Sequence, residues 1–172
     1  MAETLTTLKT RRSCRAYKPD RVEEDKLNAI IEAGTYAATG MGKQSPIIIV
    51  VENKEIRDKL SKMNAKIMGM DIDPFYGAPE LLIVLANKEI PTYVYDGSLV
   101  MGNMMNAAAD LGVASCWIHR AKEEFESEEG KAILKDLGIE GDYEGIGHLV
   151  LGYEAKPAGD PAPRKADYIY KI

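Results

Sequence analysis

Three arginines and a serine stand close together near the start of the chain. Arg11, Arg12, Ser13 and Arg15 fall within five residues, at the end of a segment with helical spacing. Guanidinium groups bind phosphate through paired hydrogen bonds, so arginines that converge can form an anion site. Arg11 and Arg15 share one face if the helix continues. The alternative is a solvated cluster of cations that pair with some of the 27 acidic residues.

A glycine-rich turn follows the second predicted helix. Residues 39–46 read Thr-Gly-Met-Gly-Lys-Gln-Ser-Pro, which invites comparison with a nucleotide-binding P-loop. A P-loop would need glycine at the position of Ala37 and serine or threonine at the position of Gln44, and it would follow a strand. We therefore interpret the segment as a turn whose backbone can approach a flat ligand closely, as glycine permits.

The spacing of the cysteines and histidines does not indicate a disulfide or a metal site. Cys14 and Cys116 form no Cys-x-x-Cys pair, and His119 and His148 lack the spacing of paired metal ligands. This argues against a disulfide and against a metal site. Beside Trp117, Cys116 is interpreted as a small buried apolar side chain. His119 is a candidate proton donor, but a lone histidine is more often a hydrogen-bonding neighbour.

The composition fits one globular domain of 172 residues with a formal net charge of −5. An acidic chain is not expected to bind nucleic acids or anionic membranes, because both are negatively charged and bind basic surfaces. The first ten residues lack the apolar core of a signal peptide, and no apolar run approaches the ~20 residues that span a bilayer. These features predict a cytoplasmic protein with no nucleic-acid or membrane partner.

One long apolar segment must be buried on most of its circumference. In residues 98–111 the polar side chains fall on one narrow stripe, so the segment predicts a helix that is apolar nearly all round. Such a helix lies either in the middle of the core or against a second subunit. Asp96 or Ser98 can cap its start, and Gly112 suits the left-handed residue that ends it.

Helices and strands alternate along the rest of the chain. Helical periodicity covers residues 4–12, 22–38, 55–70 and 123–137, and aliphatic runs typical of buried strands cover 47–51, 81–86, 113–118 and 146–153. The alternation predicts three layers, with a small sheet between helices. The strand at 113–118 would bring His119 and Arg120 to an edge. Residues 155–172, with three prolines, form a predicted extended tail.

Five short motifs occur in order along nearly the whole chain: RRSCR, TGMGKQSP, FYGAP, LGVASCWIH and PRK. In this order they resemble the FMN-dependent nitroreductase family, specifically its short members. The resemblance implies one FMN-binding domain over residues 1–172, with an α+β fold in which a small mixed sheet lies between helices. It also implies an intertwined homodimer with two FMN sites at the subunit interface, each formed by both chains. The long apolar helix would then be the subunit contact.

The resemblance assigns two basic clusters to the FMN phosphate and ribityl chain. The first is Arg11, Ser13 and Arg15, with Arg12 adjacent, and the second is Arg164, helped by Lys165. A phosphate dianion needs convergent cations. Two clusters at opposite ends of an otherwise acidic sequence agree with that need.

Two further segments are assigned to the flavin ring. In the other subunit, Thr39, Gly40 and Met41 would lie against the isoalloxazine, with Gln44 fixing that loop. Ile118, His119 and Arg120 would pass the N5 and O4 edge and offer backbone contacts. A residue among 71–73 would meet the pyrimidine edge.

The implied reaction is a two-stage oxidoreduction. NADH or NADPH would pass a hydride to N5 of FMN, and a nitroaromatic, quinone or similar acceptor would then be reduced. Since the cofactor carries the chemistry, no catalytic side chain is assigned. Three alternatives stay open: a non-catalytic protein that binds FMN for storage or redox sensing, a flavoenzyme with another outcome such as reductive dehalogenation, and an anion-binding scaffold without flavin.

Overall fold

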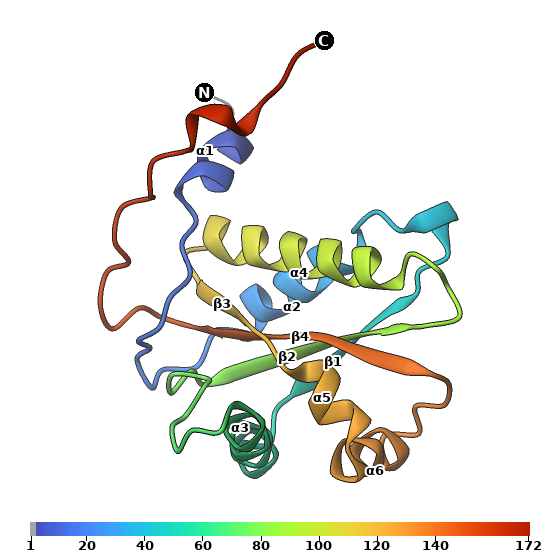
Figure 1. Ribbon diagram of the computed structural model, residues 1–172. Helices are drawn as coiled ribbons and strands as arrows, with labels where there is room; N and C mark the ends of the chain where they lie inside the picture. The colour runs from blue at the N-terminus through green and yellow to red at the C-terminus, as the bar shows by residue number, and fades with distance from the viewer. Residues whose placement is uncertain (1–2) are drawn as a thin grey trace.

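A computed structural model describes residues 3–172 and contains one four-stranded sheet (Figure 1). The strands are β1 (Pro46–Val51), β2 (Glu80–Asn87), β3 (Ala114–Ile118) and β4 (Tyr143–Gly152), in the spatial order β1-β2-β4-β3. Neighbouring strands pair antiparallel, so the mixed sheet that was expected is corrected to an antiparallel one. Alternating elements do not fix strand direction, which depends on how each connection crosses the sheet. The parallel pairing in the described residues is one bridge, from Ser13 to Ser115.

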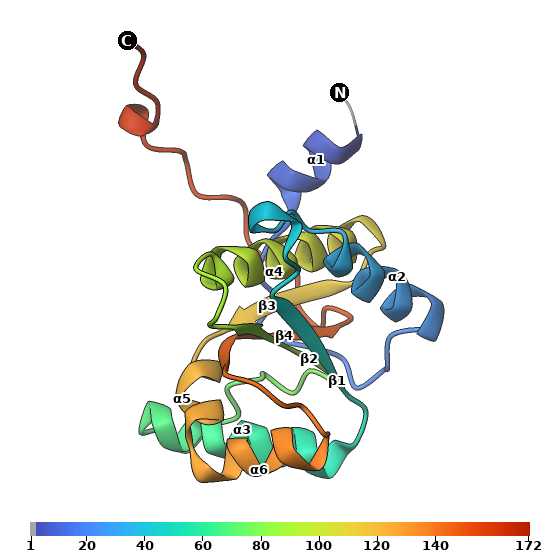
Figure 2. The ribbon, with the colours of Figure 1, turned by 90° about the vertical axis from the view of Figure 1, so that its right-hand side faces the viewer.

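Helices cover both faces of the sheet, which confirms the predicted three-layer α+β sandwich (Figures 1 and 2). One face carries α2 (Glu24–Thr35) and α4 (Tyr93–Asp110), and the other carries α3 (Lys54–Met68), α5 (Ala121–Glu126) and α6 (Glu128–Asp136). The short helix α1 (Glu3–Thr10) lies at the C-terminal end of α4, where Thr7 Oγ1 donates to Asp110 Oδ1 at 2.8 Å. Across residues 3–172, no helix has the length and apolar character needed to cross a membrane.

Helix α4 is buried on one side only. Met104 and Ala108 are fully buried in the core that α2 and the sheet complete, and a Cβ added at Gly34 of α2 would lie 2.8 Å from Met104 Cγ. The opposite side is open, since Tyr95 is 72% exposed and Leu99 is 49% exposed. Within the chain α4 is therefore a surface helix with an apolar outer side, not the middle of the core. Its burial against a second subunit stays a prediction.

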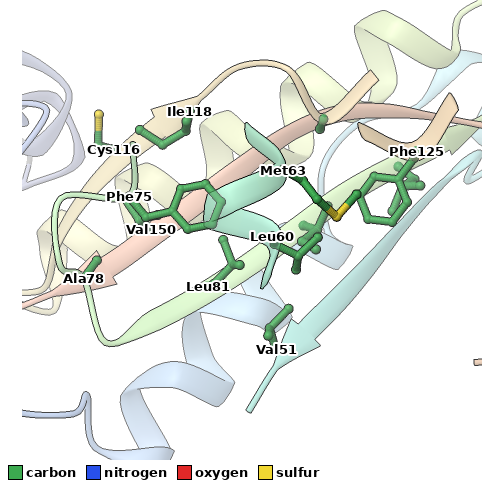
Figure 3. Close-up of a cluster of buried hydrophobic side chains, with 13 residues drawn as sticks. Val51, Leu60, Met63, Phe75, Ala78, Leu81, Cys116, Ile118, Phe125 and Val150 are labelled. Carbon is green, nitrogen blue, oxygen red and sulfur yellow. The ribbon is translucent and has the colours of Figure 1, made fainter. Parts of the chain in front are cut away.

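A second apolar core lies between the sheet and the helices α3 and α5 (Figure 3). Leu60 of α3 and Phe75 are fully buried there, and Phe125 of α5 is 3% exposed. Figure 3 shows Cys116 and Ile118 of β3 in the same cluster. Because Ile118 is anchored in this core, the point where the chain leaves the end of β3 is fixed.

The single helix predicted over residues 123–137 is wrong, because two helices occupy this stretch. Helix α5 ends at Glu126 and α6 begins at Glu128, with Ser127 extended between them at φ −72° and ψ 158°. The Ser127 hydroxyl accepts a hydrogen bond from the Gly130 N–H at 3.1 Å, as an N-cap does. The other elements lie close to their predicted positions, except that α4 begins at Tyr93 rather than near residue 98.

Candidate functional site

The arginine segment, residues 11–15, lies along the free edge of the sheet. Ser13 pairs with Ser115 of the edge strand β3, and the Cys14 N–H donates to the Ser115 carbonyl at 2.9 Å. Cys14 is only 2% exposed, whereas Arg15 stays exposed. Backbone pairing to β3 therefore holds the segment that carries the predicted anion site.

Two buried guanidinium nitrogens of this segment have no hydrogen-bond partner within residues 3–172. They are Nη1 of Arg11 and Nε of Arg12. The other two nitrogens of Arg12 donate to the carbonyls of Arg11 and Lys9, at the end of α1. A buried N–H without an acceptor is costly, so these atoms favour an acceptor that the chain does not supply. An anion is the acceptor that suits a guanidinium best.

A cavity of about 560 Å³ opens beside these arginines. It lies between the end of α1, the turn from α4 to β3 and the first part of the tail, and its lining includes Arg11, Arg12, Gly112 and residues 157–161. A neighbouring hollow of about 470 Å³ is lined by residues 12–16 and 156–160. Residues 156–161 of the tail therefore line the same hollows as the arginine segment.

The second basic cluster lies elsewhere in the single chain. The Arg164 guanidinium donates to the Ala162 carbonyl, and the Lys165 ammonium lies 5.6 Å from the centroid of the Tyr168 ring. Figure 2 shows the end of the tail and α1 diverging. One chain alone does not bring Arg164 and Lys165 to the arginine segment.

Ser13 and Arg15 face the buried thiol of Cys116. Burial raises the pKa of Cys116, and the Arg15 guanidinium and a hydrogen bond with the Ser13 hydroxyl lower it by less. Burial likewise raises the pKa of Tyr17, whose hydroxyl donates to the Cys14 carbonyl at 3.1 Å. Both side chains are therefore neutral at physiological pH, and Cys116 is the small buried residue that its sequence position predicted.

A buried carboxylate of α4 holds the glycine loop, residues 39–44. Asp96 is 2% exposed and accepts hydrogen bonds from the Gly40 N–H at 2.9 Å, the Ser45 hydroxyl at 2.8 Å and the Thr92 hydroxyl at 3.1 Å. A Cβ at Gly40 would lie 2.2 Å from Thr92 Oγ1, so only glycine fits there. The predicted capping role of Asp96 or Ser98 is wrong, since Thr92 is the N-cap residue of α4. Asp96 instead ties the loop to the helix.

The glycine loop is a tight turn with a constrained backbone. Its short 3-10 helix η1 (Gly40–Gly42) contains Met41 at φ 54°, and Gln44 has φ 50°, both in the left-handed region that costs energy for residues with a Cβ. Thr39 Oγ1 accepts a hydrogen bond from the Gln44 N–H at 3.1 Å. Met41 is 82% exposed. The loop is thus internally braced and presents its predicted ring-contacting side to solvent in the single chain.

The residues after β3 present unpaired backbone donors. Ile118 is buried, His119 is exposed, and Arg120 has a left-handed backbone at φ 77°. In the part of the chain that the structure describes, the N–H groups of His119 and Arg120 have no acceptor. The His119 ring lies 5.9 Å from the Trp117 ring, centroid to centroid. This edge can therefore offer backbone hydrogen bonds to a ligand.

Both carboxylate oxygens of Asp73 accept hydrogen bonds in and around the turn that carries the Phe-Tyr-Gly-Ala-Pro motif. Its Oδ1 accepts from the Ser61 hydroxyl at 2.6 Å and the Phe75 N–H at 3.0 Å. Its Oδ2 accepts from the Arg57 guanidinium at 2.8 Å and the Gly77 N–H at 2.7 Å. The Asp73 carboxylate is therefore already engaged within the chain.

Helix α4 separates the arginine segment from the glycine loop. The loop is bonded to the first turns of α4 through Asp96, whereas α1 and the arginine cavity lie at its last turn. The 18 residues of α4 rise about 27 Å. The end of β3 is nearer to the arginines, because their segment pairs with that strand. One chain therefore brings residues 11–15 and 118–120 to one edge, and places residues 39–44 at the far end of α4.

The model of the Nitroreductase family matches residues 8–71 and 70–153 of this chain. The chain belongs to the nitroreductase family. Among solved structures, this family member is similar to a nitroreductase with bound FMN from Bacteroides fragilis, with 31% identity, complete coverage of both chains (100% each) and a TM-score of 0.90. A nitroreductase with bound FMN from Desulfitobacterium hafniense is 27% identical, again over 100% of both chains, with a TM-score of 0.88. A protein from Archaeoglobus fulgidus, provisionally named an NADH dehydrogenase/NAD(P)H nitroreductase, is 28% identical over 158 residues, which cover 89% of this chain and 86% of that protein.

Two side chains that hold these segments in this family member were not predicted from the sequence. One is Asp96, which anchors the glycine loop. The other is Asn64 of α3, which is fully buried and donates to the His119 carbonyl at 2.9 Å. Asn64 shares the buried side of α3 with Leu60 and Met63. An asparagine within that apolar stripe is the signal that could have identified it.

Proposed function

We propose that this member of the nitroreductase family is an FMN-dependent NAD(P)H oxidoreductase. The observation that carries the proposal is the pair of buried, unpartnered nitrogens of Arg11 and Arg12 beside a cavity of about 560 Å³, which fit the phosphate of FMN. FMN is bound in the similar structures from B. fragilis and D. hafniense, and the name of the A. fulgidus relative includes NAD(P)H. These similarities support the same cofactor here.

The phosphate and ribityl chain are assigned to the arginine segment. Arg11, Ser13 and Arg15 would provide direct contacts, with the Nε of Arg12 beside them. Arg164 and Lys165 are proposed to join the phosphate in the assembled protein, because the single chain holds them elsewhere. Charge-assisted contacts of this kind are about twice as strong as neutral hydrogen bonds.

The remaining part of the site orients the ring. When bound, FMN would supply the hydride chemistry, taking a hydride from NADH or NADPH and passing it to a nitroaromatic, quinone or similar acceptor. The backbone N–H groups of His119 and Arg120 would donate at the N5 and O4 edge, where fixed dipoles stabilise negative charge without reorganising. No side chain of the described residues is assigned a proton transfer.

A homodimer is proposed because one chain cannot complete the site. The glycine loop and the arginine segment lie at opposite ends of α4, so Thr39, Gly40, Met41 and Gln44 would contact the flavin ring only from a second chain. The open side of α4, with Tyr95 and Leu99, is the apolar surface that would meet the partner.

Glutamate at Leu99 should convert the dimer to monomers. Leu99 is 49% exposed, so the change leaves the chain's own core intact but places a charge in the proposed contact. Met104, on the same helix, is not a suitable position for this test, because it is fully buried and a charge there would unfold the chain. Light scattering on a sizing column measures the mass. The matched control is Ile56→Glu on α3, where Ile56 is 38% exposed on the opposite face of the sheet (Figure 2). A dimer that survives Leu99→Glu would exclude this contact.

The visible absorption spectrum tests the function. The purified protein, loaded with FMN, should show the two flavin bands, and anaerobic NADH or NADPH should bleach them within seconds to minutes. A flavin spectrum that persists with both donors would favour the non-catalytic FMN-binding protein. A chain that stays colourless after incubation with FMN would overturn the assignment of the cofactor.

A further inference from the structure

Three fully buried polar side chains meet beneath the end of β3. Asn64 of α3, Glu124 of α5 and His148 of β4 each have 0% exposure. Glu124 Oε1 accepts from Asn64 Nδ2 at 2.5 Å, and Glu124 Oε2 lies 3.0 Å from His148 Nε2. Buried polar groups are tolerated when they are hydrogen-bonded to one another, and such networks fix a single arrangement. The roles assigned above use none of the three toward the ligand.

Asn64 connects this network to two successive residues at the surface. Its Nδ2 donates to the His119 carbonyl at 2.9 Å, and its Oδ1 accepts from Arg120 Nε at 2.8 Å. The Arg120 carbonyl is held as well, because it accepts from the Glu124 N–H at 3.0 Å. The carbonyls of His119 and Arg120 and the side chain of Arg120 are thus bonded to the interior of the protein. The N–H groups of His119 and Arg120, in contrast, have no acceptor in residues 3–172.

The backbone of Arg120 needs this support. Its φ of 77° lies in the region that glycine adopts freely and that a Cβ disfavours. The hydrogen bond from its guanidinium to Asn64 offsets that preference and keeps the peptide between residues 119 and 120 in one orientation. The buried amide therefore determines where the two unpaired donors point.

We infer that Asn64 is a positioning residue for the flavin, which sets the direction of the His119 and Arg120 N–H groups through the His119 carbonyl and the Arg120 side chain. Glu124 and His148 hold Asn64 in turn. The inference rests on the proposed FMN site, and it adds a residue that would not touch the cofactor.

Alanine at Asn64 should weaken FMN binding about tenfold and shift the long-wavelength absorption band of the bound flavin. Fluorescence titration of FMN measures the dissociation constant, and the melting temperature of the flavin-free protein reports the fold separately. The matched control is Asn103→Ala, because Asn103 Nδ2 also donates to a backbone carbonyl, that of Ala33 at 3.0 Å, but on the other face of the sheet. A lower melting temperature with an unchanged dissociation constant and spectrum would reduce Asn64 to a structural residue.

A second pair of variants keeps the test valid if Asn64→Ala does not fold. Arg120→Ala and Arg120→Gly both remove the guanidinium, but only glycine adopts the left-handed backbone without cost. Backbone positioning predicts that Arg120→Gly binds FMN severalfold more tightly than Arg120→Ala. Equal binding by the two variants would overturn the inference, since it would mean that the backbone orientation is irrelevant. Failure of the wild-type protein to bind FMN would instead overturn the proposed function.

Discussion

Alanine at both Arg11 and Arg15 should leave a folded protein that no longer retains FMN. Arg11 has a buried nitrogen without a partner, and Arg15 is exposed on the same segment, so neither guanidinium is needed by the described chain itself. Each charge-assisted hydrogen bond to a phosphate contributes about 1.5–3 kcal/mol. Two lost partners should therefore raise the FMN dissociation constant on the order of 100-fold or more. Titration of FMN fluorescence against the flavin-free protein measures this constant.

The control for this double substitution removes the same charge elsewhere. Lys62 and Lys66 are exposed on α3, on the other side of the sheet from α4. Alanine at both should leave FMN binding within about twofold of the wild type, because exposed charges at this separation are screened. If Arg11→Ala with Arg15→Ala retained FMN as the control does, the phosphate would have to lie outside the arginine segment.

Asparagine at Asp96 should cause a large loss of stability. The carboxylate is 2% exposed and accepts from the Gly40 N–H, the Ser45 hydroxyl and the Thr92 hydroxyl. A carboxamide offers one acceptor oxygen and turns an NH₂ group toward at least one of these donors. Leaving buried donors unsatisfied costs about 1–3 kcal/mol each, so we expect the free energy of unfolding to fall by about 3 kcal/mol. Denaturant unfolding followed by circular dichroism measures it.

Acid should remove the same stabilisation from the wild-type protein. Burial raises the pKa of Asp96, but the hydrogen bonds from Gly40, Ser45 and Thr92 outweigh it, so the pKa lies below its usual value. A depressed pKa in the folded state gives stability that is complete above the unfolded pKa of about 4 and is lost as the pH falls through the folded pKa. The difference between wild type and Asp96→Asn should therefore shrink below about pH 4. Asp110→Asn, at an exposed position, is the control; a difference that is constant from pH 7 to pH 3 would contradict an ionised Asp96.

The order of helices and strands was predictable because periodicity is local. Aliphatic runs at residues 47–51 and 81–86 are strands β1 and β2, and a left-handed Gly112 at φ 71° follows α4 as predicted. The break at Ser127 was missed because a single serine can either continue a helix or cap the next one. Strand direction was missed because it depends on the path of the connections, which no short pattern encodes.

In the candidate site, too, local patterns were predictable and long-range contacts were not. Arginines in a cluster indicate an anion site from composition alone, and the structure adds the pairing of their segment with β3. The bonds that hold the other two segments join residues far apart in the sequence: Asp96 and Gly40 are 56 positions apart, and so are Arg120 and Asn64. No sequence signature identifies which partner each of these residues has, because a buried polar contact of this kind depends on the packing of whole helices. The resemblance proposes these segments for the flavin site, and the structure shows the contacts that hold them in place.

The length of α4 has a consequence for handling the protein. In one chain, the proposed phosphate site and the ring-binding loop lie at opposite ends of this helix. If one flavin contacts both, it takes the phosphate site from one chain and the loop from the other. Retention of FMN would then depend on the dimer. By mass action, dilution toward the dissociation constant of the dimer should then release FMN, and added FMN should draw chains together. An apparent affinity for FMN would have meaning only at a stated protein concentration, and a preparation that looks weakly flavinated when dilute would recover its colour on concentration.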